Sequence, residues 1–185
     1  MGIGSTKDGA PTFKPRLWAV PGVSLDRPKS MGCLMIETPR LLLRPWRDSD
    51  LPVFAEQNAD PLVMRFLLHV LTRAESDAYV EATTRHLGET GYCKWAVEAP
   101  GVAPFIGAVG LTRVKFEASF TPAVEVAWRL HRRYWGQGFA TEAARAAIED
   151  GFTRVGLREI VAITTLMNQP SMRVKERDSG VAHPP

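Results

Sequence analysis

Cysteine and histidine are scarce in this sequence. Its 185 residues include two cysteines, Cys33 and Cys93, and four scattered histidines with no pair at ligand spacing. Two cysteines cannot supply a disulfide framework, and neither residue type shows the spacing of a zinc site. We therefore expect no metal centre and no fold held together by disulfides.

Long apolar runs are also missing. No stretch approaches the roughly 20 apolar residues that a membrane-spanning helix needs. The first thirty residues carry five basic side chains but no apolar segment of the kind that a secretory signal contains. The sequence thus predicts a cytoplasmic protein with no membrane partner.

A strong excess of charge is absent too. The formal net charge is +3, and the basic residues are spread along the chain without the interleaved aromatics of a single-strand binder. This pattern argues against a nucleic-acid partner. One tight basic cluster, Arg129, Arg132 and Arg133, stands directly before a glycine turn, where it suits a compact polyphosphate.

A chain of this length suits one domain. Residues 1–33 are rich in Gly, Pro, Ser and Lys and lack helical and strand periods, so we expect a disordered leader. Met31 and Met35 are therefore further candidates for the natural start. The patterned domain spans residues 34–177, and residues 178–185 are expected to form a short irregular tail.

Helical and strand patterns alternate within the domain. Helix start signals stand at Asp48-Ser49, at Asp60-Pro61 and in the capping box from Thr72 to Glu75, whose helix should end at Gly91. Strands are expected at 40–44, 94–98, 105–115, 124–130 and 159–165, and a last helix at 171–177. This order predicts an α/β fold with a mixed, mainly antiparallel sheet flanked by helices.

The clearest pattern covers residues 124–152. Residues 124–130 alternate, with Val126 and Trp128 on one face and Glu125 on the other. A turn containing Gly136 and Gly138 follows. After it comes an apolar stripe at helical spacing, with Gly156 as its expected stop: Ala140, Ala143, Ala144, Ala147, Ile148 and Phe152.

Such a strand, turn and helix predict an anion site. Glycines allow a ligand to approach closely, and the first N–H groups of the helix favour negative charge. A tight turn without a ligand is the simpler alternative. A P-loop is excluded because Phe139 follows Gly138 where that motif has lysine. A dinucleotide-binding turn is disfavoured because the preceding strand does not open a βαβ repeat.

At these residues the chain resembles the GNAT superfamily of N-acetyltransferases. The acetyl-CoA signature of that family, Arg/Gln-x-x-Gly-x-Gly/Ala, is present as Arg133-Tyr-Trp-Gly136-Gln-Gly138. The branch grouped with ribosomal-protein N-terminal alanine acetyltransferases is similar in further segments, at 37–44, 128–130, 136–143 and 168–171. The resemblance implies the GNAT fold and transfer of an acetyl group from acetyl-CoA to a primary amine, on a protein N-terminus or a small molecule.

The resemblance also implies which residues hold acetyl-CoA. Main-chain groups of a splayed strand would bind the pantetheine arm as an extra strand would, and amides of the turn would bind the pyrophosphate. Arg133 would stand beside the turn, whereas ordinary surface charge is an equal alternative for Arg132. The expected cofactor-binding residues are Trp128, Arg129, Leu130, Arg133, Gly136, Gln137, Gly138, Ala140, Thr141 and Asn168.

Two residues are candidates for catalysis. An attacking amine must lose a proton, and Glu125, on the strand before the turn, is the candidate base. A solvated surface carboxylate is the alternative. The resemblance places Ser171 where it would assist the departing sulfur and Asn168 where it would bond pantetheine. For both residues the alternative is a helix cap.

The chain departs from the family after residue 177. Family members usually continue with two more strands, whereas residues 178–185 are polar and end in prolines. We therefore expect a sheet without its last two strands and with an open edge, which a homodimer is one way to cover. A catalytically impaired acetyl-CoA-binding or interaction module is the alternative to an active enzyme.

Overall fold

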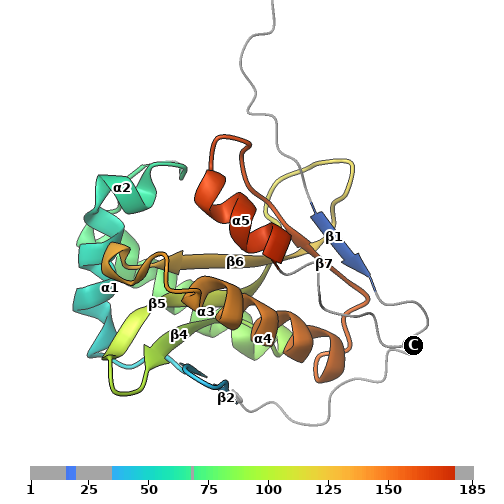
Figure 1. Cartoon of the computed structure of the whole chain (residues 1–185). Helices are drawn as coiled ribbons and strands as arrows, with labels where there is room; N and C mark the ends of the chain where they lie inside the picture. Colours follow the sequence, from blue (N-terminus) through green and yellow to red (C-terminus); the bar gives the residue numbers. More distant parts are fainter. Residues whose placement is uncertain (1–15, 20–34, 68, 178–185) are drawn as a thin grey trace, which may run out of the picture.

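The sheet holds seven strands in the order β1-β7-β6-β5-β4-β3-β2 (Figure 1). The computed structural model describes residues 16–19, 35–67 and 69–177. Neighbouring strands are antiparallel, except that β6 and β7 are parallel. The strands are β1 (Arg16–Ala19), β2 (Ile36–Glu37), β3 (Leu42–Arg44), β4 (Lys94–Ala99), β5 (Ala103–Arg113), β6 (Val124–Leu130) and β7 (Glu159–Ala162). The predicted mixed, mainly antiparallel sheet is confirmed.

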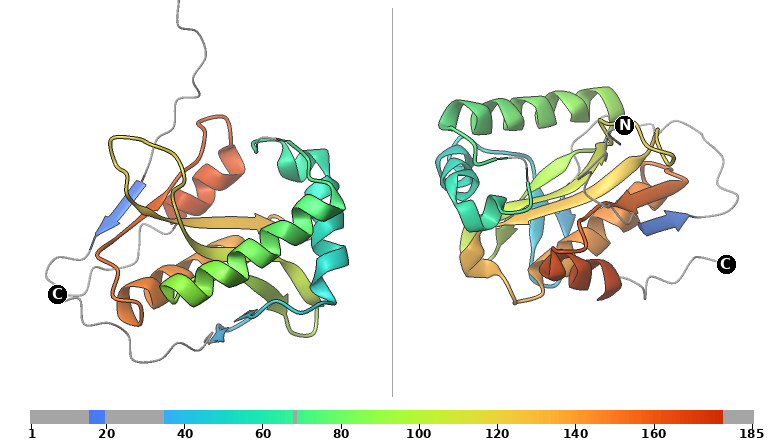
Figure 2. Two further views of the ribbon diagram at one scale, coloured as in Figure 1. Left: turned by 180° about the vertical axis from the view of Figure 1, so that it is seen from behind. Right: turned by 90° about the horizontal axis from the view of Figure 1, so that it is seen from above.

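Helices cover both faces of this sheet. Helix α3 lies along one face, and α4 and α5 lie on the opposite face (Figure 2). The helices are α1 (Asp50–Ala59), α2 (Pro61–Met64), α3 (Arg73–Thr90), the 3₁₀ turn η1 (Arg132–Tyr134), α4 (Phe139–Thr153) and α5 (Gln169–Arg177). Within the described residues, no helix combines the length and the apolar character needed to cross a membrane.

Two apolar clusters show which strand residues face which helices. The cluster on the α4 face includes Trp95, Val126, Ala143 and Ile148. The cluster on the face of α1 and α3 includes Phe54, Val80, Ala96 and Ala108. Successive strand residues point to opposite faces, so Lys94, Glu125 and Arg129 share the face of α1 and α3.

Local signals explain two of the helix starts. The capping box of α3 is present, with Thr72 accepting from the N–H of Glu75, and the helix ends at Gly91 in the left-handed conformation. Asp60 caps α2 by accepting from the N–H of Leu62. The predicted side-chain cap of α1 is not formed. Ser49 stands at the N-cap but makes no side-chain bond there.

A buried carboxylate replaces that cap at the start of α1. Asp50 accepts from the N–H of Arg47 at 2.8 Å and from the Arg44 guanidinium at 2.8 and 2.9 Å. Arg44 is only 1% exposed and also donates to Glu98 at 2.7 Å. Such a paired and hydrogen-bonded arrangement is how a buried charge becomes tolerable, and here it ties α1 to β3 and β4.

One segment of the expected leader belongs to the sheet. Residues 16–19 form β1, which pairs antiparallel with β7 from Arg16↔Ala162 to Ala19↔Glu159. Disorder was therefore the wrong prediction for these residues, because their partner strand is remote in sequence and leaves no local pattern. β1 lies at the side of β7 that we expected to be an open edge. The rest of residues 1–34, and 178–185, lie outside the described residues.

Several element boundaries differ by a few residues from the predicted ones. The strand predicted at 40–44 begins only at Leu42, as β3, because the preceding residues form a turn closed by the bond from Thr38 N–H to the Leu41 carbonyl. On the other side of this turn lies β2, a strand that was not predicted. Helix α4 ends at Thr153, before the predicted stop at Gly156, and β7 ends at Ala162. Helix α5 begins at Gln169, two residues earlier than predicted.

Candidate functional site

A gap opens between the two parallel strands. β6 and β7 share one register position, Glu125↔Val161, and β6 then runs on to Leu130 while β7 ends at Ala162 (Figure 1). Over residues 126–130, β6 is thus paired along its length with β5 alone among the described strands. This is the splayed strand that the family resemblance implied.

The main-chain groups of β6 point alternately to β5 and to the gap. At the two ends of the β5–β6 ladder, His131 N–H donates to the Ile106 carbonyl and Val114 N–H donates to the Ala123 carbonyl, both at 2.9 Å. Alternate residues of an antiparallel strand address the same neighbour. The odd-numbered residues of β6 therefore bond with β5, and the even-numbered ones, Trp128 and Leu130 among them, face the gap.

Arg129 is therefore a wrong choice among the main-chain ligands. Its carbonyl points toward β5 and accepts a further bond from the Gln57 amide at 2.8 Å. The Leu130 carbonyl is also used, because the indole N–H of Trp135 donates to it at 2.8 Å. Both main-chain groups of Trp128 and the N–H of Leu130 remain directed to the gap.

The predicted glycine turn connects β6 to α4. Gly136 and Gly138 have φ values of 76° and 81°, in the left-handed region that favours glycine. Gly138 is the N-cap of α4, and the first bond within the helix runs from Glu142 N–H to the Gly138 carbonyl. The N–H groups of Ala140 and Thr141 therefore have no partner within the helix, and its positive dipole end lies at the turn.

Arg40 and Glu142 hold this turn in place, and sequence reasoning assigned neither of them a role. Their side chains form an ion pair at 2.6 Å, and Arg40 also donates to the Gln137 carbonyl at 2.9 Å. Partial burial raises the pKa of Glu142, but hydrogen bonds from Thr38 and Arg40 outweigh this and hold the pKa below its ordinary value. The two residues are 102 positions apart, so no local pattern could have linked them.

The two arginines before the turn differ in their partners. Arg132 pairs with Asp60 of the α1–α2 junction at 3.4 Å, which supports the surface-charge alternative for this residue. Arg133 is exposed, and its side chain forms no ion pair with any described carboxylate. Its carbonyl accepts from the Gln137 side chain at 3.2 Å, which joins η1 to the turn.

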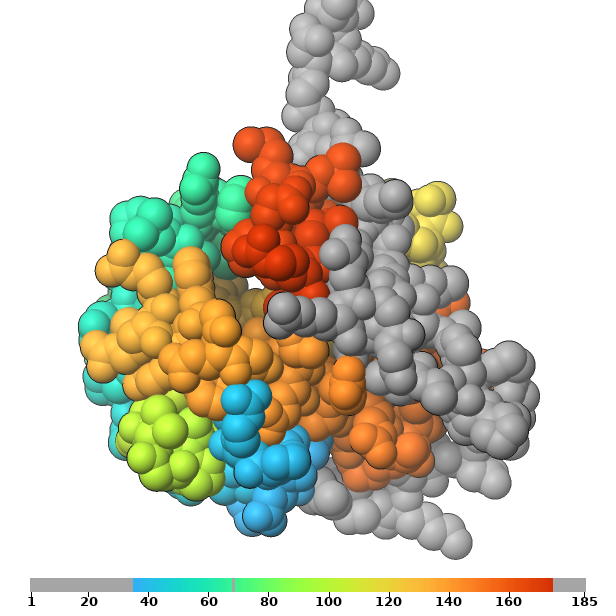
Figure 3. Space-filling model, in the orientation of Figure 1, coloured from blue at the N-terminus to red at the C-terminus, as the bar shows by residue number. Residues whose placement is uncertain are grey.

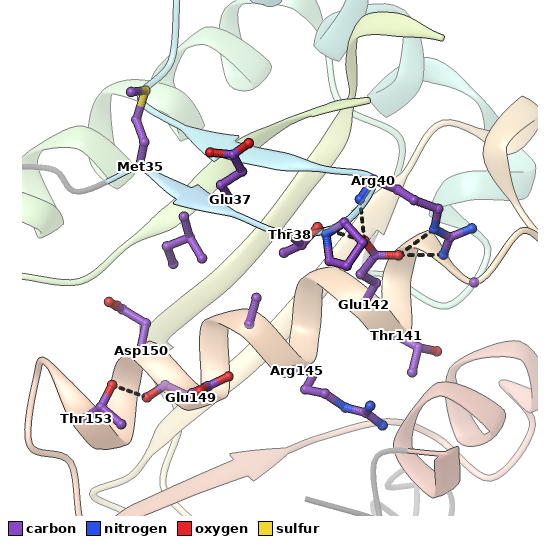
Figure 4. A pocket seen from close by; sticks show the side chains of 14 residues that line it. Met35, Glu37, Thr38, Arg40, Thr141, Glu142, Arg145, Glu149, Asp150 and Thr153 are labelled. Atoms are coloured by element: carbon purple, nitrogen blue, oxygen red, sulfur yellow. Dashed lines mark hydrogen bonds and ion pairs between the residues drawn. The ribbon is translucent and has the colours of Figure 1, made fainter. Parts of the chain in front are cut away.

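A groove of about 840 Å³ runs along α4 beside β2 (Figure 4). Met35 and Glu37 line one wall, and Arg145 and Glu149 line the other. The groove reaches the turn at Gly138, where the Arg40–Glu142 pair lies across it. Its described lining includes no residue of β6 or β7, so the groove adjoins the turn but does not include the gap.

Trp128, Asn168 and Ser171 meet on the α4 and α5 side of the gap. The indole N–H of Trp128 donates to the Ser171 hydroxyl oxygen at 3.3 Å. The Asn168 side-chain oxygen accepts from the Ser171 N–H at 3.2 Å, so Asn168 caps α5, as the simpler alternative predicted. Figure 3 shows the surface hollowed where α5 meets the segment before α4, with α2 on the far rim.

Glu125 lies on the other side of the gap, half-buried on the face of α1 and α3. Burial raises the pKa of its carboxyl group, and the Lys94 charge opposes this only in part, so the net pKa lies above its ordinary value. Shifted carboxyl groups of this kind are frequent at functional sites. The predicted residues therefore divide into two groups, Glu125 on one face and Trp128, Ser171, Asn168 and the turn on the other, with the gap between them.

Comparisons with known proteins agree on one family. A family model for the acetyltransferase (GNAT) domain matches residues 40–177. A Bacillus subtilis protein described as "uncharacterized N-acetyltransferase YnaD" is 29% identical over 143 residues, which are 77% of this chain and 79% of that protein. A solved GNAT-family acetyltransferase from Bacillus anthracis matches with a TM-score of 0.64 and 26% identity, over 79% of this chain and 82% of that one.

A second solved structure bears on the fold alone. Spermidine N-acetyltransferase from Vibrio cholerae, in complex with CoA and spermine, matches with a TM-score of 0.61 and 20% identity. The match covers 77% of this chain and 81% of that one.

Proposed function

This chain belongs to the GNAT acetyltransferase family, whose members use acetyl-CoA, and from that premise we propose that it acetylates a primary amine by direct attack. The observation that carries the proposal is the gap between β6 and β7, which opens between Glu125 and Ser171. A cytoplasmic location and a homodimer remain predictions. The pairing of β1 with β7 removes the open β7 edge that suggested the homodimer.

The turn and the gap together fit acetyl-CoA. A pyrophosphate needs N–H donors and close approach, and the turn offers the N–H groups of Ala140 and Thr141, which have no partner within the helix, beside two glycines. A Cβ on Gly138 would lie 3.3 Å from the Arg40 guanidinium, so a side chain would fill this cradle. The pantetheine arm carries amides, and Trp128 and Leu130 direct main-chain groups into the gap. Acetyl-CoA supplies the acetyl group as a reactive thioester.

Glu125 accepts the proton of the attacking amine. Its carboxyl group stands where β6 leaves β7, on the face opposite Trp128. A carboxylate with a raised pKa is a better base near neutral pH than an ordinary exposed one. As the carbon–nitrogen bond forms and the carbon–sulfur bond breaks, the amine releases its proton to Glu125 directly or through one water.

Ser171 protonates or hydrogen-bonds the departing thiolate. Its oxygen already accepts from the Trp128 indole, so its own O–H is the group left to donate, and no described residue accepts from it. Asn168 fixes this position through the main chain of Ser171, and its amide N–H₂ stays available for the pantetheine arm. The acceptor amine and the thioester thus meet in the gap from opposite faces of the sheet.

Thiol release from acetyl-CoA, measured with a panel of primary amines and with mass spectrometry of the products, tests the proposed function. We expect at least one amine to accelerate thiol release and to gain an acetyl group. If acetyl-CoA raises the melting temperature but no amine accelerates release, the chain is the acetyl-CoA-binding module and the enzyme proposal fails.

A further inference from the structure

A group of charged and aromatic side chains lies on the face of α1 and α3 around Glu125. We call it the Arg129 cluster; its members are Tyr79, Lys94, Glu125 and Arg129. Lys94 on β4 aligns with Gly110 on β5 and Ala127 on β6, midway between Glu125 and Arg129. The Lys94 ammonium lies 5.4 Å from the centre of the Tyr79 ring.

Arg129 has little to neutralise it within the described residues. Its guanidinium donates to the neutral side-chain oxygen of Asn58 at 2.7 Å and lies over the Tyr79 and Phe54 rings at 5.3 and 5.9 Å. No described carboxylate lies within 4 Å of it. A guanidinium has five N–H donors, so most of its hydrogen-bonding capacity faces no charged partner.

The cluster therefore carries more positive than negative charge. Lys94 and Arg129 contribute two positive charges, and Glu125 contributes one negative charge. Burial raises the pKa of the Tyr79 phenol, but the charges of Lys94 and Arg129 outweigh that effect, so its net pKa lies below the ordinary value. A lowered pKa is what a positive potential produces in a phenol.

We propose that the Arg129 cluster binds an anionic group of the acceptor, so that the acceptor is an amine that also carries a carboxylate. The inference rests on the proposed function in placing the amine at Glu125. Arg129 then binds the carboxylate, for which a guanidinium has matching geometry, while Lys94 keeps Glu125 from repelling it.

The spacing suits an acceptor built from amino acids. Glu125 and Arg129 are four residues apart on the same face of β6, about 13 Å between their α carbons. Their side chains can reach toward each other over Ala127, which leaves several ångströms between amine and carboxylate. A short amino acid or a peptide with acidic residues after its free N-terminus has such a spacing, whereas a polyamine would add positive charge to a site that already has an excess.

Matched acceptors test the charge preference. The peptides are the C-terminal amides of Ala-Asp-Glu, Ala-Asn-Gln and Ala-Lys-Lys, and the small molecules are γ-aminobutyrate and its amide. Calorimetry in the presence of coenzyme A gives Kd, and thiol release gives kcat and KM. We expect the anionic member of at least one series to bind about tenfold to hundredfold more tightly than its neutral counterpart. The series that shows the preference identifies the source of the carboxylate.

Three variants connect that preference to Arg129. Arg129→Gln is expected to reduce the ratio of anionic to neutral Kd to about one, with acetyl-CoA affinity unchanged, whereas Arg129→Lys retains part of the preference because it keeps the charge. Arg73→Gln removes one exposed positive charge on α3 and should leave the ratio unchanged. Melting temperatures confirm that each variant is folded.

The outcomes separate the two proposals. Equal affinity of the wild type for anionic and neutral members, or a preference that survives Arg129→Gln, overturns the inference even if amines are acetylated. Arg129-dependent binding of the anionic members without any acetylation supports the inference and refutes the proposed function.

Discussion

The indole N–H of Trp128 donates to the hydroxyl oxygen of Ser171 at 3.3 Å, and this bond joins β6 to the first turn of α5. It orients the hydroxyl group, because an oxygen that accepts from the indole has its own hydrogen left to give. The bond also places Ser171 beside the main-chain groups of Trp128 that face the gap. Two residues whose roles the sequence suggested separately thus form one unit.

Removal of the Ser171 hydroxyl should slow the departure of the thiol. We expect Ser171→Ala to lower kcat by about tenfold to a hundredfold, which is at or below the low end of the range usual for loss of an acid–base group. The KM for acetyl-CoA should change little. Ser171→Thr keeps the hydroxyl and should retain more activity than Ser171→Ala. Stopped-flow thiol detection checks this. A Ser171→Ala variant with wild-type kcat would reduce Ser171 to a structural residue of α5.

A side chain at Gly138 should prevent acetyl-CoA binding. Gly138→Ala places a Cβ 3.3 Å from the Arg40 guanidinium at a φ of 81°, in the cradle proposed for the pyrophosphate. Gly91→Ala is a matched control, because Gly91 has a φ of 78° with nothing within 4 Å of its Cβ position. Both variants should lower the melting temperature by a similar amount. Only Gly138→Ala should raise the Kd for acetyl-CoA, and equal affinities in the two variants would remove the turn from the site.

The pH dependence of turnover should reflect the Glu125 carboxyl group. Its pKa is raised, and a base acts only when deprotonated, so kcat/KM for the amine should increase as pH rises through that raised pKa. Among the described residues, Lys94 and Tyr79 are the titratable groups that interact with it, and Arg129 lies on the same face of β6. In Lys94→Met the carboxylate loses a stabilising charge, so this limb of the profile should move to higher pH. If the limb does not move in Lys94→Met, the group that titrates there is not Glu125.

The buried ion pair between Arg44 and Asp50 should matter for stability rather than for turnover. Asp50→Asn leaves the 1%-exposed Arg44 without its buried counter-charge, which should lower the free energy of unfolding by about 3 kcal/mol. Asp77→Asn breaks the exposed pair with Arg73 and should cost less than about 1 kcal/mol. Urea unfolding compares the two. Equal losses of unfolding free energy in the two variants would contradict the claim that the buried pair stabilises the fold more than the exposed one.

Much of the fold could be predicted from signals between residues that are close together in the sequence. The capping box at Thr72 and Glu75, the left-handed Gly91 and the alternation of β6 depend on residues within one turn or one strand, and each was confirmed. Long-range pairings carried no such signal. β1 has its partner at the other end of the chain, and nothing in its composition indicates β7.

The candidate site divides in the same way. Turn glycines at positive φ are visible in the sequence because few other residues accept that conformation. Which main-chain groups of β6 face the gap depends on its register with β5, and this is why Arg129 was misassigned as a main-chain ligand. The Arg40–Glu142 pair was missed because the two residues meet only after the turn between β2 and β3 packs on α4.

The most direct test of the account is the turnover of Glu125→Gln with an amine that the wild type acetylates. Loss of the base should lower kcat by about 10²- to 10⁴-fold while the Kd for acetyl-CoA stays within about twofold of wild type. The exposed control Glu81→Gln on α3 should match the wild type in both values. Wild-type turnover in Glu125→Gln would contradict the proposal that the amine gives its proton to Glu125.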